Sequence, residues 1–197
     1  MTIKQRRTDE DVIQERAIKT REKILTAALE MYTEKGYHST TVDEIAKRAG
    51  LSTGIAYRYF KNKKELLLTA LNYAFENIQE IAGVSEEDLF DDNISGILKA
   101  FERIHAQYWD FHEELEGLRH SDRDVKELYD GFKQMALRSI YENLPAKKKE
   151  KPHSWEKLNL SIGLMENYCH TYMDRSFSEE ELVFMREEVI RMVGRLL

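Results

Sequence analysis

Apolar residues recur along most of this chain at spacings of three and four, which places them on one face of an α-helix. The first such stripe runs through residues 24–31, and Gly36 stands where a helix commonly ends in a left-handed residue. We therefore expect a first helix over about residues 17–35. Residues 1–16 are charged and carry no apolar period, so we expect a flexible arm there.

Two much shorter helices are expected next. Thr41 and Glu44 have the spacing of a capping box, in which a hydroxyl and a carboxylate satisfy the amide donors at a helix start. The helix that begins there ends at Gly50. Ser52, a residue type that favours the N-cap, follows only two positions later. The turn is therefore very short, and a third helix covers residues 53–59.

The rest of the chain predicts longer helices. A fourth apolar stripe indicates a helix over about residues 62–82, followed by an acidic loop at 85–92. Further stripes predict helices over about 93–119, 122–144, 154–174 and 179–196. Loops are expected between them at 119–122, 145–152 and 175–178. These elements together predict an all-α fold.

Composition agrees with this fold. The 197 residues are 42% hydrophobic and include only two prolines and nine glycines, which suits long helices. The lone cysteine excludes a disulfide within the chain and a metal site of several cysteines. No run approaches the roughly 18 apolar residues of a membrane span, and the polar start lacks a signal peptide's apolar core. We expect a cytoplasmic protein with no membrane partner.

The net charge of −6 conceals a division along the chain. Residues 1–66 contain 14 Lys and Arg against 10 Asp and Glu, a net of +4. Residues 67–197 contain 16 against 26, a net of −10. A basic block on an acidic chain is typical of a protein in which one domain meets nucleic acid and the other does not, although a split of this size also arises by chance.

The two short helices and the turn between them form a recognisable structural motif. A short helix, a tight turn built on glycine and a second short helix make a helix-turn-helix. Ala46 and Ala49 permit a close helix crossing, and Gly50 can adopt the positive φ that the turn needs. The second helix can then enter a DNA major groove by its N-terminal end.

The segment TTVDEIAKRAGLSTGIAYRYFKNKKELL, residues 40–67, resembles the signature of the TetR family of transcriptional regulators. The preceding REKILTAALEMYTEKGY resembles the family's first helix. The resemblance implies an N-terminal three-helix DNA-binding domain at 17–66. It also implies a larger helical domain at 67–197 that binds a ligand and dimerises, with the helix at 62–82 as the connector.

Carried over residue by residue, the resemblance implies a set of contacts to double-stranded operator DNA. Thr53 would read a base and Arg58 would read guanine, whereas the remaining members would meet phosphates or open the recognition helix. The chain departs from the family at Tyr59, where His is usual, and at Ile55, which either touches a thymine methyl or packs inward. The arm cations Lys4, Arg6 and Arg7 are either solvated or reach a minor groove. The expected DNA-binding residues are Thr41, Ser52, Thr53, Gly54, Tyr57, Arg58, Tyr59 and Lys63.

By the same resemblance, a small-molecule effector would bind in the ring-rich segment after residue 100. Aromatic walls with a few polar groups suit an apolar or cationic ligand, but they make an ordinary core equally well. His105, His112 and Glu116 share a helix face, and we interpret them as a polar stripe rather than a metal site, so no metal or cofactor is expected. The candidate effector residues are Phe101, His105, Tyr108, Trp109, His112 and Phe132.

The last two helices are the candidates for a homodimer interface, because the resemblance places an intermolecular four-helix bundle there. The alternative is that both of their apolar stripes pack inside one subunit. Cys169 is interpreted as a small buried apolar residue rather than a redox sensor. The stripes are Ile162, Met165 and Cys169 on one helix and Met185, Val189 and Met192 on the other.

The leading hypothesis is a DNA-binding repressor that an effector releases from its operator. An enzyme is not expected, because the chain has no Gly-rich phosphate loop, nucleophile elbow or paired-histidine metal motif. A third possibility is a helical module that binds a protein and uses the helix-turn-helix only as a scaffold. Tyr57, Arg58 and Lys63 distinguish the two, since a scaffold has no need of them together.

Overall fold

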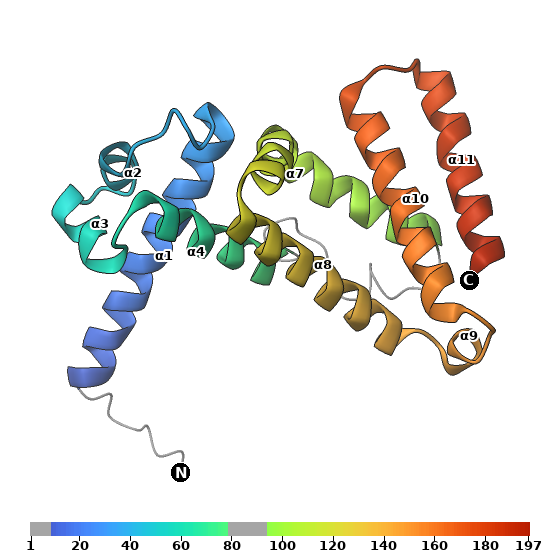
Figure 1. Cartoon of the computed structure of the whole chain (residues 1–197), viewed down its shortest axis with the longest axis horizontal. Coiled ribbons are helices and arrows are strands. Elements are labelled where there is room, and N and C mark those ends of the chain that lie inside the picture. Colours follow the sequence, from blue (N-terminus) through green and yellow to red (C-terminus); the bar gives the residue numbers. More distant parts are fainter. Residues whose placement is uncertain (1–8, 79–93) are drawn as a thin grey trace, which may run out of the picture. The chain divides into compact units, whose positions relative to one another are not determined.

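The computed structural model describes residues 9–78 and 94–197, and every regular element within these ranges is a helix, which confirms the all-α prediction (Figure 1). The chain divides into two compact units, Met1–Ala74 and Phe75–Leu197. None of the described helices is long and apolar enough to cross a membrane. The elements are α1 (Asp9–Lys35), α2 (Val42–Arg48), α3 (Thr53–Tyr59), α4 (Lys63–Glu76), α7 (Ile94–Ser121), α8 (Arg123–Asn143), α9 (Ala146–Lys149), α10 (Ser154–Asp174) and α11 (Glu179–Leu196).

Helix α1 begins at Asp9, so the expectation of an arm over the whole of residues 1–16 is wrong for its second half. The physical reason is that residues 9–16 contain no Gly or Pro and are rich in good helix formers, so they extend the helix without an apolar stripe. Glu15 and Lys19 add an ion pair of 2.7 Å one helical turn apart. The arm cations Lys4, Arg6 and Arg7, the expected end of α4 near Ala82 and the acidic loop at 85–92 lie outside the described residues.

The capping signals in the N-terminal unit act as predicted. The Thr41 backbone N–H donates to the Glu44 carboxylate at 2.9 Å, and the Glu44 N–H donates to the Thr41 hydroxyl at 3.3 Å. Gly36 and Gly50 adopt φ values of 79° and 72°, the left-handed region in which glycine has no steric penalty. Ser52 occupies the N-cap of α3 with extended backbone, but its side chain makes no capping hydrogen bond.

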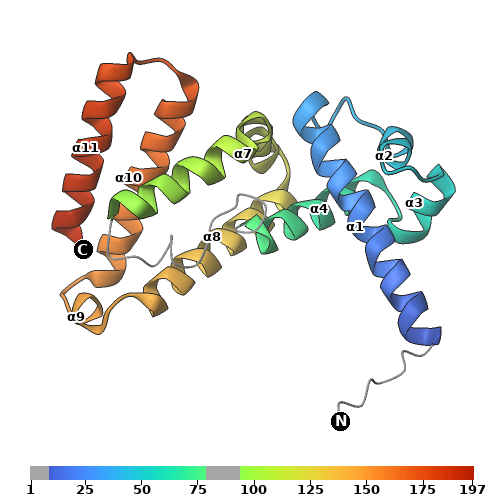
Figure 2. The same cartoon turned by 180° about the vertical axis from the view of Figure 1, so that it is seen from behind.

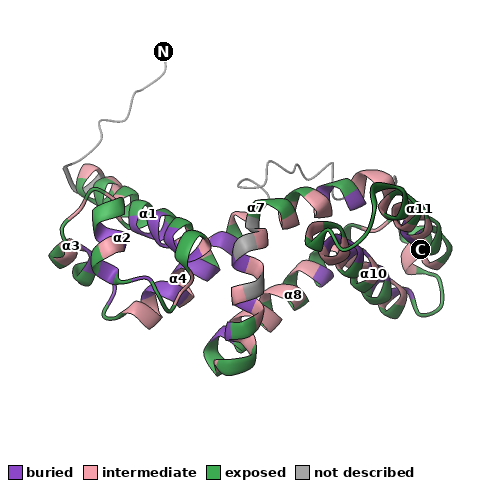
Figure 3. Cartoon of the chain, turned by 90° about the horizontal axis from the view of Figure 1, so that it is seen from above, coloured by how far each residue is buried: buried purple, intermediate pink, exposed green. Residues whose placement is uncertain are grey.

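The core of the N-terminal unit is formed where α1, α2, α3 and α4 face one another. The buried faces of these helices are coloured purple in Figure 3. Ile45 of α2 is fully buried, and Ala56 of α3 is fully buried as well. Burial of such side chains, rather than helix propensity, holds helices as short as α2 and α3 in place, because isolated helices of this length are marginal in water. The largest fully buried side chains here are Ile24, Leu25, Tyr32, Ile45, Leu66, Leu67 and Leu71.

The C-terminal unit is built around α10, which packs against α7, α8 and α11. Helices α10 and α11 run antiparallel and side by side, joined by a short connection (Figures 1 and 2). The predicted bounds of α7, α8, α10 and α11 agree with the structure to within two residues. The expected loop at 145–152 contains the one-turn helix α9, since Pro145 can start a helix and Ala146–Lys149 are good helix formers.

Apolar side chains from α7, α10 and α11 form the core of the C-terminal unit. Cys169 has no exposed surface, and its burial raises the pKa of the thiol to about 12. The thiolate is the reactive form of cysteine, so this thiol is kept protonated at neutral pH. The core residues are Leu98, Met165, Tyr168, Cys169, Val189 and Val193.

A cluster of histidines lies at the contact of α7 and α10. The Nε2 atoms of His112 and His170 are 2.9 Å apart, so one ring donates a hydrogen bond to the other. His105 packs edge-on against both, with ring centroids 5.8 Å from His112 and 5.4 Å from His170. Its Nδ1 lies 2.8 Å from the carbonyl oxygen of Phe101. Trp109 stacks on His112 at 6.0 Å and closes one side of the cluster.

Two histidines of the cluster, His105 and His112, have a lowered pKa and therefore favour the neutral form. Burial lowers the pKa of His112 to about 4, and the positive charge that His170 and His105 acquire on protonation lowers it further. Burial likewise lowers the pKa of His105, although the hydrogen bond to the Phe101 carbonyl opposes this effect. A neutral ring can donate one hydrogen bond and accept another, which the contact between His112 and His170 requires.

Removing a core side chain should destabilise the N-terminal unit. We predict that Ile45→Ala lowers the free energy of unfolding by about 2–5 kcal/mol, because it leaves a cavity at a fully buried site. Urea unfolding followed by far-ultraviolet circular dichroism measures this change. Lys47→Ala, at an exposed position of the same helix, is the control and should cost about 0.5 kcal/mol or less. Equal stability of the Ile45→Ala protein and the control would contradict this packing.

The histidine cluster predicts a pH dependence. The folded pKa of His112, about 4, lies below its ordinary value of 6.5. Between these values the unfolded chain binds a proton that the folded chain excludes, so the free energy of unfolding falls as the pH is lowered from 6.5 towards 4.

We expect His112→Gln to make this dependence on pH shallower. Urea midpoints measured at several pH values by tryptophan fluorescence test it, since both tryptophans, Trp109 and Trp155, belong to the C-terminal unit. His120→Gln, at an exposed position of α7, is the matched control. A slope that is the same in both variants would show that His112 is protonated freely in the folded protein.

Candidate nucleic-acid interface

The turn between α2 and α3 sets how these helices meet. The Gly50 N–H donates to the Lys47 carbonyl at 3.1 Å, and the Leu51 N–H donates to the Ala46 carbonyl at 2.9 Å. These bonds satisfy the last carbonyl groups of α2, as a left-handed helix end commonly does. Ala46 is fully buried, so α3 can approach α2 closely at this point. The predicted helix-turn-helix is therefore present.

Helix α3 presents one face to the core and the other to solvent. Ala56 is fully buried, and Phe60, at the C-cap of α3, is almost so. Tyr57 is 53% exposed, and Arg58 beside it is also exposed. Ile55 is half-buried. A phenol and a guanidinium on an outward helix face are groups that donate hydrogen bonds to phosphates or base edges.

Two hydroxyl residues of the expected interface lie exposed at the starts of α2 and α3: Thr41, expected to touch a phosphate, and Ser52, expected to open the recognition helix. The Thr41 hydroxyl donates to the Glu44 carboxylate at 2.9 Å, so its proton is used within the capping box. Hydrogen bonds from Lys35 and Thr41 lower the pKa of Glu44 to about 2 and keep this carboxylate charged at neutral pH. Ser52 is exposed, and Gly54, two residues further on, is exposed as well.

Thr53, the expected base reader, is half-buried and hydrogen-bonds to another helix. Its hydroxyl donates to the carboxylate of Asp43, an exposed residue of α2. The sequence analysis did not assign Asp43 to the site. Ten positions separate the two residues, a spacing that carries no periodic signal across a turn, so their contact depends on the crossing of α2 and α3.

Lys63, at the first position of α4, lies against the connection between α1 and α2. Its ammonium sits 4.4 Å from the centroid of the Tyr37 ring and donates to the His38 carbonyl at 3.3 Å. A cation over an aromatic face is attracted by the ring quadrupole, so Tyr37 helps to orient this side chain. The sequence analysis overlooked Tyr37 and His38, because no local pattern links them to a residue about 25 positions away.

Ion pairs join α1 to α2. Arg48 bonds Glu30 at 3.2 Å and Glu34 at 2.6 Å, and Lys35 bonds Glu44 at 2.8 Å. Exposed pairs of this kind contribute little to stability. Their effect here is on the local charge, because the carboxylates of Glu30 and Glu34 neutralise the positive charge of Arg48.

The candidate effector residues are distributed over three places in the C-terminal unit. His105, Trp109 and His112 belong to the histidine cluster. Phe132 stacks on Phe75 with ring centroids 4.3 Å apart. Phe101 lines a separate cavity, and the side chain of Tyr108 lies outside the described part of the chain.

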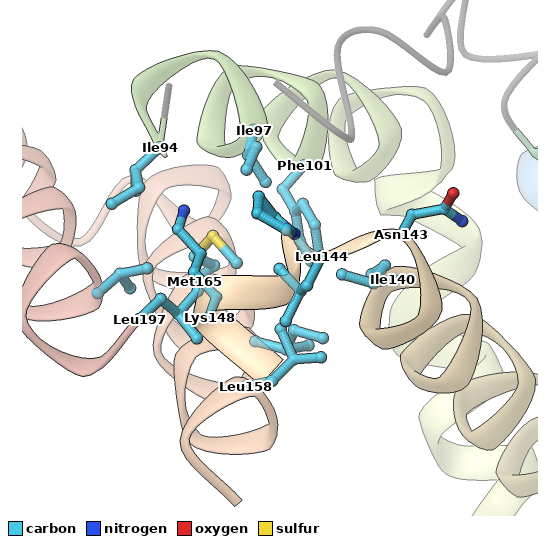
Figure 4. Close-up of a pocket in the computed structure, with 13 residues that line it drawn as sticks. Ile94, Ile97, Phe101, Ile140, Asn143, Leu144, Lys148, Leu158, Met165 and Leu197 are labelled. Carbon is cyan, nitrogen blue, oxygen red and sulfur yellow. The ribbon is translucent and has the colours of Figure 1, made fainter. Parts of the chain in front are cut away.

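That cavity lies where α7, α8, α10 and α11 meet, and its lining is shown in Figure 4. Its volume is about 40 Å³, whereas ligand pockets commonly measure about 300–1,000 Å³. Most of its lining could not be predicted from the sequence, because these side chains come from five helices and the connection before α9. The lining residues are Ile94, Ile97, Phe101, Ile140, Asn143, Leu144, Pro145, Lys148, Leu158, Ile162, Met165, Val193 and Leu197.

The polar stripe on α7 is engaged in contacts other than metal binding. Glu116 pairs with Arg119 at 2.6 Å, and His112 pairs with His170. Within residues 9–78 and 94–197, no group of three or more His, Cys, Asp or Glu is arranged to hold a metal ion.

The expected dimer stripes lie mostly inside their own subunit, which is the alternative stated above. Met165, Cys169 and Val189 are buried in the C-terminal core, and Ile162 and Met185 pack against it. Met192 is different, being 45% exposed. A heptad-like pattern cannot distinguish a contact within one subunit from a contact between two, so this arrangement needed the tertiary structure.

The comparisons with known proteins agree with the helix-turn-helix geometry. Residues 24–70 match the family model described as "Bacterial regulatory proteins, tetR family". The chain is 47% identical over 60 residues to the uncharacterized HTH-type transcriptional regulator YuxN of Bacillus subtilis, a match that covers 30% of this chain and 21% of that protein. It is 39% identical over 66 residues to the fatty acid metabolism regulator protein of the same organism, covering 34% of this chain and 32% of that protein.

A third relative, the HTH-type transcriptional regulator BetI of Serratia proteamaculans, is 34% identical over 80 residues, which cover 41% of this chain and 40% of that protein. The matched segments therefore span well under half the length of these three relatives. All three are described as regulators.

Solved structures share the fold over nearly the whole chain. A TetR-family transcriptional regulator from Rhodococcus sp. superimposes with a TM-score of 0.69 at 17% identity, covering 90% of this chain and 97% of that one. A transcriptional regulator from Aquifex aeolicus VF5 gives 0.65 at 22% identity, covering 90% and 99%. The N-terminal segment at residues 24–70 thus matches the TetR family of bacterial regulatory proteins, and the whole chain shares its fold with solved structures of that family.

Proposed function

We propose that this protein is a sequence-specific DNA-binding repressor, which binds a double-stranded operator as a homodimer and is released by a small-molecule effector. The observation that carries the proposal is the outward face of α3. Tyr57 and Arg58 point away from the core there, while Ala56 and Phe60 anchor the helix beneath them.

The chemistry of this face suits a DNA duplex. Arg58 can donate two hydrogen bonds to guanine in the major groove, and Tyr57 can donate to a phosphate. Lys63 adds a cation that Tyr37 holds in place. The expected contacts at Thr41, Ser52, Gly54 and Tyr59 remain part of the proposal. Net positive charge over residues 1–66 favours approach to the polyanion.

A homodimer follows from the geometry of DNA. One recognition helix reads few base pairs, and two-fold dimers place two such helices about 34–36 Å apart, one turn of the duplex. We propose that the partner docks on the exposed apolar side chains of α11. Phe184 and Met192 are 62% and 45% exposed and, being eight positions apart, share one helix face.

Effector control rests on the small apolar cavity of the C-terminal unit. A cavity of about 40 Å³ cannot hold a metabolite unless the surrounding helices separate. A ligand that enters it therefore binds a different arrangement of α7, α8, α10 and α11 better than the present one. Such differential binding is what shifts a population between a conformation that binds DNA and one that does not.

Loss of a phosphate contact should weaken binding to every DNA sequence. We predict that Lys63→Ala lowers affinity for DNA flanking the protein's own gene, and that the slope of log K against log salt becomes shallower by about one for each subunit. Fluorescence anisotropy across a salt titration measures both quantities. Lys126→Ala, which removes the same charge from an exposed site on α8, should change neither.

The result that would contradict the proposed function is simple to observe. If the wild-type protein does not bind the DNA flanking its own gene even at low salt, the proposed function is contradicted. If Lys63→Ala and Lys126→Ala have the same salt slope, Lys63 does not meet a phosphate.

The dimer proposal has its own test. We predict that Phe184→Glu shifts the protein from dimer to monomer in analytical ultracentrifugation, because a buried unpaired carboxylate opposes association. DNA affinity should fall at least about tenfold with the loss of the second recognition helix. Met135→Glu is the control, since Met135 is 67% exposed on α8. A Phe184→Glu protein that remains dimeric would place the interface elsewhere.

A further inference from the structure

We propose that Asp43 fixes the direction of the hydrogen bond that Thr53 makes with DNA, and so selects adenine or cytosine at the base this threonine faces. The inference rests on the proposed DNA-binding function and adds to it a specificity-determining residue outside the recognition helix.

The geometry begins with the first residue of α3. The Thr53 hydroxyl donates to the Oδ1 atom of Asp43, which belongs to α2. A hydroxyl has a single hydrogen and two lone pairs. Because that hydrogen is committed to the carboxylate, the Thr53 oxygen has only lone pairs to offer to a third group.

Asp43 is well placed to keep this role. It lies between Val42 and Ile45, which are buried and anchor α2 in the core, and it falls within the capping box of Thr41 and Glu44. Its own oxygens also only accept hydrogen bonds while it is ionised. Together, Thr53 and Asp43 therefore form a small surface that accepts hydrogen bonds and donates none.

Two cations of this unit are paired with glutamates. Arg48, on the same helix as Asp43, bonds Glu30 and Glu34 of α1. Lys35 bonds Glu44. The acceptor character of the Asp43 and Thr53 pair is thus set by the fold, and both residues remain at least partly exposed.

The major groove offers few groups that can satisfy such a pair. Its hydrogen-bond donors are the N6 amino group of adenine and the N4 amino group of cytosine, whereas guanine presents acceptors at this edge and thymine presents an acceptor and a methyl group. An acceptor-only pair facing guanine or thymine leaves polar groups desolvated and unpaired. A carboxylate near the phosphates also costs general affinity, so its effect is discrimination rather than binding strength.

The test is selection of binding sites from a randomised DNA library, using the full chain. We expect the wild type to enrich adenine or cytosine over guanine and thymine by about tenfold at one position in each half-site. Asp43→Asn should reduce this preference to about threefold or less, because the amide can donate to the Thr53 oxygen and free the hydroxyl hydrogen. Thr53→Val should remove the preference at the same position only.

Two further variants complete the design. Thr53→Ser keeps the hydroxyl and its hydrogen bond to Asp43, so it should retain the base preference. This variant still tests the proposal if circular dichroism shows that Asp43→Asn does not fold. Asp130→Asn makes the same charge change at a partly exposed site of α8 and should leave the selected sequence unchanged.

The outcomes separate the two proposals. A wild-type protein that enriches no sequence would overturn the proposed function. A wild type that enriches a clear site, with the same preference at every position in Asp43→Asn and Thr53→Val, would overturn the role of Asp43 and leave the regulator intact. Loss of the preference in Thr53→Ser would also overturn it.

Discussion

The close crossing of α2 and α3 is the constraint on which the DNA-facing surface depends. Gly50 turns the chain with a positive φ, and the small buried side chains of Ala46 and Ala56 let the two helices approach. Phe60 and Ile45 then fix α3 from below. Because one side of α3 packs against the core, the opposite side, which carries Tyr57 and Arg58, faces solvent.

The same crossing explains why residues far from the recognition helix belong to its chemistry. It brings Asp43 of α2 to Thr53 of α3, and the connection after α1 brings Tyr37 to Lys63. Each contact restricts a side chain, so under the proposed function less conformational entropy is lost when DNA binds. The proposed DNA-binding surface therefore includes side chains of several elements, held in place before binding, and is not limited to the recognition helix.

The C-terminal unit uses its apolar residues differently. The apolar stripes of α10 and α11 pack largely within the subunit's own core. Phe184 and Met192 remain as exposed apolar positions on one face of α11. A half-buried polar cluster, His105, His112 and His170, lies between α7 and α10. Since polar groups tolerate burial only when they are paired, this cluster restricts how the two helices can move against each other.

Much of the architecture could be predicted from the sequence, because it depends on local chemistry. Apolar spacing, the Thr41 and Glu44 capping box and the glycines at 36 and 50 determine helix bounds within a few residues, and α3 agrees with its predicted range of 53–59. The start of α1 was misplaced because helix propensity without an apolar stripe gives no periodic signal.

Contacts between helices were decided only by the tertiary structure. His170 lies 58 positions from His112, and the cavity lining comes from five helices, so no local pattern could indicate either. The same holds for Asp43 beside Thr53 and for the packing of the stripe with Met165 and Cys169 inside its own subunit. The sequence by itself determined where helices form and which side of each is apolar, because these depend on neighbours within a few residues. Which apolar side meets which, and which polar atoms come within hydrogen-bonding distance, depended on how those helices pack in space.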